Sequence, residues 1–278
     1  MELSEKLIHK YEEDGLLFLP EYFSDREISI LQNELSHLPE DAPGKVLENN
    51  KKTVRALHGC HEYSEIFKSV VRHPRLLKPV MQILKKSVYL YQFKVNMKAA
   101  FTGDSWPWHQ DYTFWSKEDY LPTSEAISVS IFLDEVNHFN SPIYFIPGSH
   151  KGGLIDIEGQ MEDRSKKGTD WEASFSANLK YCLDCTTVTQ MVKKRGMLAP
   201  VGSKGSVILF HSNIAHASTP NISPYDRRQI IISYSSIKNI PIPKNQPRPA
   251  FLVCRDYNPL QPEKDDVLLS LIYDTINC

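Results

Sequence analysis

The stretch Trp106-Pro107-Trp108-His109-Gln110-Asp111-Tyr112-Thr113-Phe114-Trp115 holds the pattern on which the interpretation of the whole chain depends. At its centre, one residue separates His109 from Asp111. Because side chains alternate between the faces of a β-strand, a strand through this pair would turn both groups to the same side. A neighbouring imidazole and carboxylate can bind one divalent metal ion. A second, distant histidine would complete the two-histidine, one-carboxylate set of non-haem Fe(II) oxygenases.

Two residues are candidates for that second histidine. His211 and His216 both lie in a segment that could contain a strand end, and Arg227 follows His216 by eleven residues. A guanidinium at that position could form a bidentate pair with the carboxylate of a ligand in a metal-facing cavity. Taken singly, each feature also has an ordinary explanation: a His-x-Asp can arise by chance, and an arginine at the start of a strand is commonly on the surface.

Length and composition indicate a globular protein. The chain has 278 residues, of which 41% are hydrophobic and 24% charged, and its net charge is -2. No basic stripe is present, so nucleic acid is not an expected partner. No apolar run approaches transmembrane length, so a membrane partner is not expected either. The odd number of cysteines, five, argues against a disulfide framework and predicts a cytoplasmic protein.

The first part of the chain carries helical signals. Residues 3–14 form an amphipathic pattern, and Ser24 precedes a second helix that has Asp25 and Glu27 in its first turn. Residues 64–84 predict two further helices, interrupted near Pro74. Between these helices we expect a short buried strand at 15–20 and a loop at 40–52.

From residue 88 onward the hydrophobic pattern changes to a period of two. It predicts strands at residues 88–97, 126–133, 142–146, 206–210 and 229–234. On the first strand, Gln92, Lys94 and Asn96 share a face with Leu90, and the opposite face carries Tyr89, Tyr91, Phe93, Val95 and Met97. Strands joined by turns, without helices between them, indicate an antiparallel barrel or jelly roll.

We therefore expect a mainly β protein with flanking helices, a double-stranded β-helix (jelly roll, cupin-like). It would form a single domain over residues 1–278, with an N-terminal helical part at about 1–86 and a jelly-roll core at about 87–240. The polar insert at about 150–200 contains one expected helix near 187–194. An insert of this length is either a lid over the site or a surface excursion.

The full set of motifs resembles the phytanoyl-CoA dioxygenase family of Fe(II)/2-oxoglutarate oxygenases. The likeness extends to Pro147-Gly148-Ser149-His150 and to Asn221-Ile222-Ser223-Pro224, and it covers the chain to about residue 260. The resemblance implies that His109, Asp111 and His216 are the catalytic metal ligands and that Arg227 holds a carboxylate of 2-oxoglutarate. It also implies Fe(II), 2-oxoglutarate as co-substrate, and O₂.

Two groups within the family look closest. Thr53-Val54-Arg55-Ala56-Leu57, Tyr91-Gln92-Phe93-Lys94 and the late Arg248-Pro249 resemble free-leucine 5-hydroxylases. Ectoine hydroxylase is the second group: its co-substrate and substrate pocket is lined at positions similar to Gln92, Asn96, Trp115 and Ser218. The resemblance thus implies co-substrate contacts for Gln92, Asn96 and Ser218, and a substrate contact for Trp115. After Asp111 this chain departs from the ectoine hydroxylase sequence His-Ser-Asp-Phe-Glu-Thr-Trp-His.

The expected function is hydroxylation of an unactivated C–H bond in a free, aliphatic, leucine-like L-amino acid, with release of succinate and CO₂, as in natural-product biosynthesis. Such a small-molecule substrate needs a cation for its carboxylate. Arg55 is the candidate, with His58 or His61 assisting; alternatively, Arg55 pairs with a structural acid.

Other functions remain open from the sequence. The substrate could be another small metabolite, either ectoine-like or bound to a carrier or to CoA. A metal-binding jelly roll without turnover is a further alternative. A related halogenase would need a small residue in place of Asp111, and a nucleic-acid demethylase would need a basic groove that the charge balance does not provide.

Overall fold

The computed structural model describes residues 2–155, 179–242 and 247–276, with side chains described as far as residue 271. Within them lie the strands β1 (Leu16–Leu19), β2 (Lys45–Leu47), β3 (Val54–His58), β4 (Val88–Lys98), β5 (Trp106–His109), β6 (Ala126–Phe132), β7 (Tyr144–Phe145), β8 (Val207–His211), β9 (His216–Ser218) and β10 (Arg227–Ser236). The strands build one seven-stranded sheet, in the order β1-β8-β6-β10-β4-β3-β2, and one three-stranded sheet, in the order β5-β9-β7. Every pairing is antiparallel.

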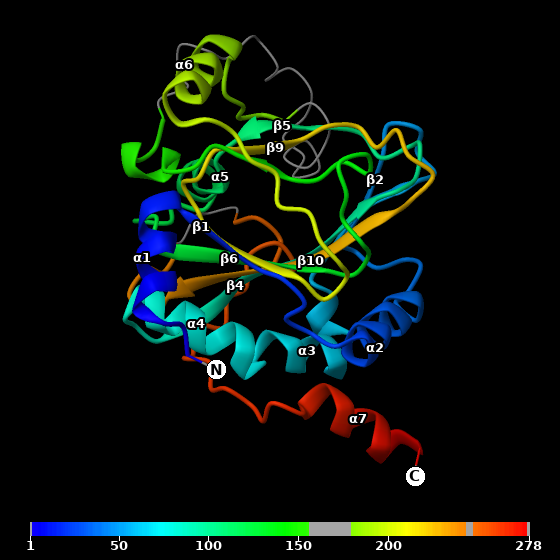
Figure 1. The fold of residues 1–278 in the computed structure, drawn as a ribbon. Coiled ribbons are helices and arrows are strands. Elements are labelled where there is room, and N and C mark those ends of the chain that lie inside the picture. The colour runs from blue at the N-terminus through cyan, green and yellow to red at the C-terminus, as the bar shows by residue number, and fades with distance from the viewer. Residues whose placement is uncertain (1, 156–178, 243–246, 277–278) are drawn as a thin grey trace.

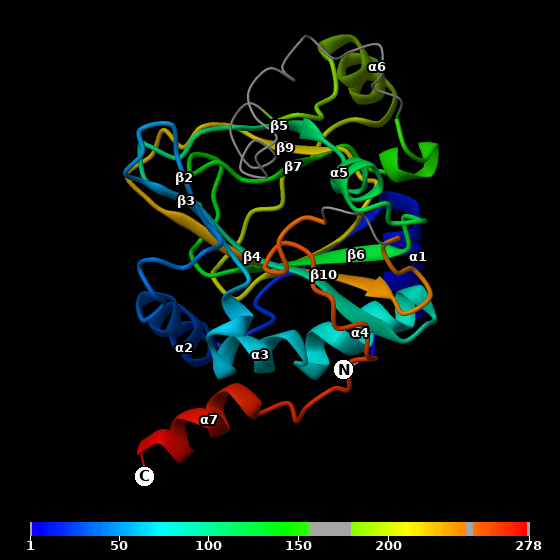
Figure 2. The ribbon, with the colours of Figure 1, turned by 180° about the vertical axis from the view of Figure 1, so that it is seen from behind.

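The helices of the described residues are α1 (Glu5–Asp14), α2 (Asp25–Ser36), α3 (Glu65–Val71), α4 (Pro74–Leu84), α5 (Asp111–Glu118), α6 (Cys185–Arg195) and α7 (Val267–Ile276), with 3₁₀ turns η1 (Cys60–Glu62) and η2 (Ser149–Gly152). Figures 1 and 2 show α2, α3 and α4 against one face of the large sheet, and the small sheet across its other face. Two facing antiparallel sheets flanked by helices confirm the predicted jelly-roll class.

The large sheet contributes to two apolar layers. Its helix-covered face packs against α2, α3 and α4 through a cluster that includes Ile28, Leu31, Phe67, Leu77, Phe93, Val129, Leu209 and Ile230. Its other face packs through Phe132, Ile208 and Phe210 against Phe145 of the small sheet. Because both faces are covered, nearly all residues of the central strands β6, β8 and β10 are buried, whichever face they point to.

The N-terminal helices begin where the sequence predicts. Ser24 and Glu27 form a capping box at the start of α2, in which the Glu27 carboxylate accepts from the Ser24 backbone N–H at 2.8 Å. Pro74 is the first residue of α4, where its missing N–H costs no helical hydrogen bond. These helices and the strand at residues 15–20 are confirmed.

Several of the described elements were not predicted, among them β2, β3, α5 and α7. Lys45–Leu47 forms β2 inside the segment expected to be a loop, and the expectation was wrong there. This strand is three residues long and exists through pairing with β3, which also had no strand prediction. Sequence periodicity cannot detect so short a strand, because its formation depends on a neighbouring strand. The helix α7 was missed as well.

The face assignment of β4 needs a correction. A bulge shifts the register with β10, so that Ser233 pairs with Gln92 whereas Tyr234 pairs with Leu90. The extra residue places Tyr91 with the cluster around α5, and Phe93 with the helix-covered core. Tyr91 and Phe93 therefore do not share a face as the alternation predicted, because a bulge interrupts the period of two.

Part of the insert lies outside the described residues, namely 156–178. The predicted helix near 187–194 is confirmed as α6. A lid function for the insert stays a prediction. The four cysteines of the described residues, Cys60, Cys182, Cys185 and Cys254, are free. None of the helices in the described part of the chain is long and apolar enough to cross a bilayer.

Candidate active site

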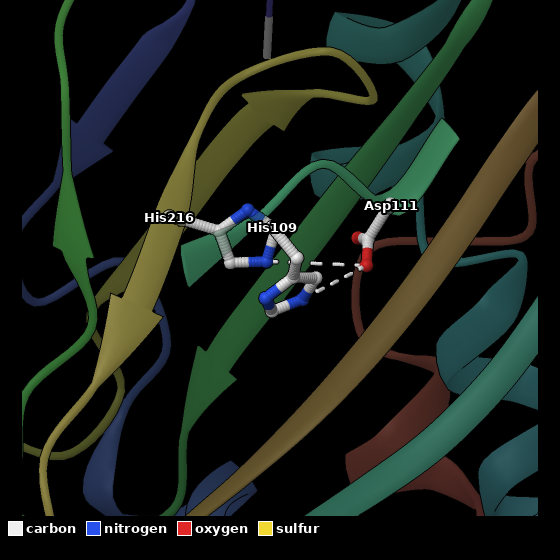
Figure 3. A group of neighbouring side chains, drawn as sticks. All are labelled: His109, Asp111 and His216. Carbon is white, nitrogen blue, oxygen red and sulfur yellow. Dashed lines mark ion pairs between the residues drawn. The ribbon is translucent and has the colours of Figure 1, made fainter. Parts of the chain in front are cut away.

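His109 and Asp111 do not lie on one strand, as the sequence pattern had suggested. β5 ends at His109, and Asp111 is the first residue of α5. The turn from strand to helix nevertheless brings both side chains to the same side. Figure 3 shows that the Asp111 carboxylate and both imidazoles converge. The spacing thus correctly predicted proximity, but for a different geometric reason.

His216 completes the group from the neighbouring strand. It is the first residue of β9 and the register partner of His109. The Asp111 Oδ1 atom lies 3.6 Å from His109 Nε2 and 3.9 Å from His216 Nε2, and the two imidazole centroids are 4.2 Å apart. One ligand atom from each residue lies within 4.8 Å of the other two. A single ion can therefore contact all three.

The backbone sets the orientation of both imidazoles. His109 Nδ1 lies 2.6 Å from the Pro107 carbonyl oxygen, and His216 Nδ1 lies 3.0 Å from the Ile214 carbonyl oxygen. Since a carbonyl only accepts, each Nδ1 carries the proton and each Nε2 presents a lone pair. Second-sphere bonds of this kind are how metal-binding histidines are held.

The charge at the centre also suits a cation. Burial by itself would raise the pKa of Asp111, but nearby positive charge, above all the Lys94 ammonium, holds that pKa below its ordinary value. Asp111 Oδ2 is buried and has no hydrogen-bond partner. Burial, with His109 nearby, lowers the pKa of His216 to about 4, so this imidazole is neutral at pH 7. An unpaired carboxylate oxygen together with imidazole nitrogens is the donor set that divalent iron binds.

His211, the other candidate, lies elsewhere. Its ring packs against His150 at a centroid distance of 5.0 Å, and its Nδ1 accepts from the Asn213 backbone N–H at 2.9 Å. That acceptor role leaves His211 in a structural contact beside η2. The geometry therefore selects His216.

A cavity with about 670 Å³ of space, including its opening to solvent, lies beside the three residues. Its aromatic wall comes from Trp106, Phe114, Trp115 and Phe210. Its cations are Lys94, Arg227 and Arg248.

Arg227 lines the cavity and has no carboxylate partner among the described residues. Its Nε donates to the Ser141 carbonyl at 3.0 Å and its Nη1 to Gln229 Oε1 at 2.8 Å, whereas Nη2 is buried without a partner. Burial lowers the pKa of Arg227 to about 9. The adjacent Arg228 instead pairs with Asp134, at 2.7 Å. A buried guanidinium with a spare N–H group fits the carboxylate end of a bound acid.

The other predicted co-substrate contacts also line this cavity. Asn96 Oδ1 and Ser218 Oγ are buried and unpaired, so both have capacity for a ligand. Gln92 Nε2 donates to the Leu252 carbonyl at 2.9 Å. Trp115 is 2% exposed, lines the cavity and lies 4.8 Å from the Tyr91 ring centroid.

Arg55 and His58 lie outside the cavity lining. Arg55 Nη1 pairs with Glu48 at 2.9 Å, its Nη2 donates to the Ser105 carbonyl at 2.6 Å, and its guanidinium lies 3.9 Å from the Trp106 ring centroid. Arg55 therefore supports one wall from behind. His58 is buried, and burial holds its pKa well below the ordinary value. The position of neither residue favours the substrate contact expected from the sequence.

The sequence analysis did not assign Arg248 to the site. Its Nε donates to Asp119 at 2.8 Å, its Nη2 bonds the same carboxylate, and Tyr91 donates its hydroxyl to Asp119 as well. Burial would lower the pKa of Arg248, but Asp119 raises it above its ordinary value. An arginine among prolines in a loop has no periodic signal, so only the fold reveals its position.

Comparison with known proteins agrees with this geometry. A sequence profile described as phytanoyl-CoA dioxygenase (PhyH) matches residues 11–229. The chain is 37% identical over 260 residues to L-proline trans-4-hydroxylase from Streptomyces griseoviridis, which covers 93% of this chain and 96% of that protein. It is 31% identical over 261 residues to an ectoine dioxygenase from Bordetella bronchiseptica, covering 91% of this chain and 83% of that protein.

Solved structures give the same result. The structure of EctD from S. alaskensis with 2-oxoglutarate and 5-hydroxyectoine matches with a TM-score of 0.77 and 26% identity, over 94% of this chain and 87% of that chain. The form with bound Fe matches with a TM-score of 0.75 at the same identity and coverage. The predicted enzyme class, a 2-oxoglutarate-dependent dioxygenase, and the predicted cofactors iron, 2-oxoglutarate and O₂ are thereby confirmed. The chain belongs to the phytanoyl-CoA dioxygenase family.

Proposed function

We propose that this protein hydroxylates an unactivated C–H bond of a small, free, aliphatic L-amino acid. His109, Asp111 and His216 would hold the iron, and Arg227, with Asn96 and Ser218, would hold 2-oxoglutarate. The observation that carries the proposal is the presence of two separately held guanidinium groups, Arg227 and Arg248, in the cavity beside the His-Asp-His group. Two carboxylates, one from the co-substrate and one from an amino acid, match these two cations.

The relatives support this substrate class. The names L-proline trans-4-hydroxylase and ectoine dioxygenase describe enzymes that act on small, free, amino-acid-like molecules. A leucine-like substrate remains our specific expectation from the sequence, and L-proline is the second candidate because of the 37% identity to a proline hydroxylase. Both have an aliphatic side chain that fits an aromatic wall.

The residues of the chain have distinct roles in this proposal. Iron, when bound, supplies the chemistry that couples decarboxylation of 2-oxoglutarate to hydroxylation. Arg227 binds the far carboxylate of 2-oxoglutarate and so fixes the orientation of the co-substrate. Arg248 replaces Arg55 as the proposed partner of the substrate carboxylate, because Arg248 lines the cavity, whereas Glu48 and the Ser105 carbonyl already engage both terminal nitrogens of Arg55. Trp115 and Phe114 exclude water and position the side chain of the substrate.

Asp119 has a supporting role. It bonds two nitrogens of Arg248, which leaves the third nitrogen, Nη1, for a substrate carboxylate. The same arrangement keeps a buried guanidinium charged without a bound substrate. The Tyr91 hydroxyl holds Asp119 in turn.

The test is a mass-spectrometric screen of the common L-amino acids with Fe(II), 2-oxoglutarate and air, with succinate quantified in parallel. We expect a mass increase of one oxygen for leucine-like amino acids or proline, matched by succinate. Asp111→Ala is the control. If the enzyme hydroxylated only an acyl thioester or a carrier-bound residue, the proposed reaction would still hold, but the proposal that the substrate is a free amino acid would be wrong. No succinate with any substrate would contradict the enzymatic proposal itself.

A further inference from the structure

Gln229 is a buried polar residue that the proposed function does not use. It lies on β10 between Arg227 and Ile231, both of which line the cavity, and it is fully buried. Alternate residues of a strand point to the same face, so these three side chains share the cavity face of the sheet. A buried amide in this position needs partners for both of its ends.

One end of the Gln229 amide is explained. Its Oε1 accepts from Arg227 Nη1 at 2.8 Å. Because a guanidinium only donates, the oxygen must face Arg227, and this fixes which end of the amide is oxygen. The amide nitrogen is therefore the end that faces away from Arg227 Nη1.

The other end is not explained by the protein. Gln229 Nε2 is buried and has no hydrogen-bond partner among the described residues, and the same is true of Arg227 Nη2. Unpaired buried donors are costly, so such a pair calls for an acceptor that arrives with a ligand. Two N–H donors next to a fixed positive charge match the two oxygens of one carboxylate.

The neighbouring strand places this pair beside the co-substrate region. Asn96, the register partner of Gln229 on β4, lines the cavity, and its Oδ1 is also unpaired. On the opposite side, Arg227 Nε is engaged with the Ser141 carbonyl. Only the Nη2 group of the Arg227 guanidinium is left for a ligand. Gln229 accepts from Nη1 of the same guanidinium, so its own unpaired Nε2 belongs to the side chain next to that free group.

We propose that Gln229 is a co-substrate-binding residue. Its Oε1 holds the guanidinium of Arg227, and its Nε2 donates a hydrogen bond to the far carboxylate of 2-oxoglutarate. This inference rests on the proposed function and adds a residue to its co-substrate site. A purely structural Gln229 would hold Arg227 without touching the co-substrate, and the test separates these two roles.

The test compares two 2-oxo acids that differ only at the far end. 2-Oxopentanoate keeps the chain length and the 2-oxo acid end of 2-oxoglutarate but has a methyl group where 2-oxoglutarate has its far carboxylate. Binding of each acid is measured by anaerobic calorimetry on Mn(II)-loaded protein, so that no turnover is needed. The variants are Gln229→Met and Gln229→Glu, with Gln190→Met at an exposed position of α6 as the matched control.

We expect Gln229→Met to weaken 2-oxoglutarate binding by about tenfold, the size of one lost hydrogen bond to a charged group. Binding of 2-oxopentanoate should be unchanged. Gln229→Glu retains an acceptor for Arg227 but replaces the donor with a carboxyl group. It should weaken 2-oxoglutarate binding further, and increasingly so as pH rises and that carboxyl ionises. This variant provides the test on its own if Gln229→Met fails to fold.

If Gln229→Met lost the same affinity for 2-oxoglutarate as for 2-oxopentanoate, Gln229 would only maintain the shape of the site, and the inference would be overturned. Unchanged 2-oxoglutarate affinity in both variants would overturn it too. If the wild-type protein bound metal but neither 2-oxo acid, the proposed function itself would be contradicted. That result can be told apart from failure of this inference, which would appear only in the comparison between the wild-type protein and the Gln229 variants.

Discussion

His109 and His216 are register partners on β5 and β9, and their imidazole centroids lie 4.2 Å apart. Each ring is fixed by its own Nδ1 contact with a carbonyl two residues earlier in the chain, Pro107 for one and Ile214 for the other. Strand pairing thus sets the separation of the two rings, and local backbone sets their tautomers. The small sheet therefore positions the two imidazoles, whereas the third member of the group, Asp111, comes from α5.

Removing a triad residue should abolish iron binding. Asp111→Ala deletes the anionic ligand, so we expect loss of both stoichiometric iron and hydroxylation; His109→Ala and His216→Ala should behave alike. His211→Ala is the control, because His211 contacts His150 and the Asn213 backbone instead. Iron content by elemental analysis is the measurement. Iron lost from His211→Ala but kept by His216→Ala would show that the wrong histidine was chosen.

Arg227→Ala should mainly weaken 2-oxoglutarate binding. A hydrogen bond between two charged groups contributes about 1.5–3 kcal/mol, or roughly ten- to a hundredfold in affinity. Arg228→Ala is the adjacent control, since Arg228 pairs with Asp134 at a partly exposed position, and it should change the KM for 2-oxoglutarate by less than about threefold. An unchanged KM in Arg227→Ala would remove this residue from the co-substrate site.

Arg248 should determine the affinity for the amino acid. We expect the double variant Arg248→Met/Asp119→Asn, which avoids leaving a buried carboxylate unpaired, to raise the substrate KM by at least about tenfold. Binding of 2-oxoglutarate should be nearly unaffected. Arg255→Met is the control, because Arg255 is exposed and donates to the backbone carbonyl of Arg248 rather than to its side chain. If the double variant lost affinity for the amino acid and for 2-oxoglutarate to the same extent, a specific contact between Arg248 and the substrate carboxylate would be contradicted.

Arg55→Ala should destabilise the fold rather than abolish substrate binding. The variant leaves Glu48 buried without its cation, and breaking a buried pair of this kind costs about 3–5 kcal/mol. Urea denaturation of wild type and variant measures the loss. If stability stayed normal while turnover of leucine-like substrates disappeared, the substrate role expected from the sequence would be supported instead.

Stability should fall on acidification between about pH 6.5 and pH 4. Burial, with His150 nearby, lowers the pKa of His211 to about 4, whereas the unfolded chain has the ordinary value of about 6.5. Below pH 6.5 the unfolded state therefore binds a proton that the folded state does not, and stability present above pH 6.5 is lost as pH falls. Thermal unfolding across this range should show a smaller decrease for His211→Gln than for wild type. If the melting temperatures of wild type and His211→Gln fell equally with pH, His211 would not be the group responsible for the acid destabilisation.

Sequence alone determined the features that depend on local chemistry. The capping residue Ser24, the proline at the start of α4 and the apolar runs of the sheet each specify an element within a few residues. The spacing of His109, Asp111, His216 and Arg227 identified the family, because this chemistry needs those groups in a fixed order.

Tertiary structure decided what depends on contacts between distant segments. The β4 bulge moved Tyr91 to the α5 side, where it holds Asp119. Arg55 and Arg248 look alike in sequence, yet Glu48 engages one behind the cavity wall and Asp119 holds the other at the cavity itself. A guanidinium binds whichever carboxylate the folded chain brings to it, and that choice has no periodic signal in the sequence.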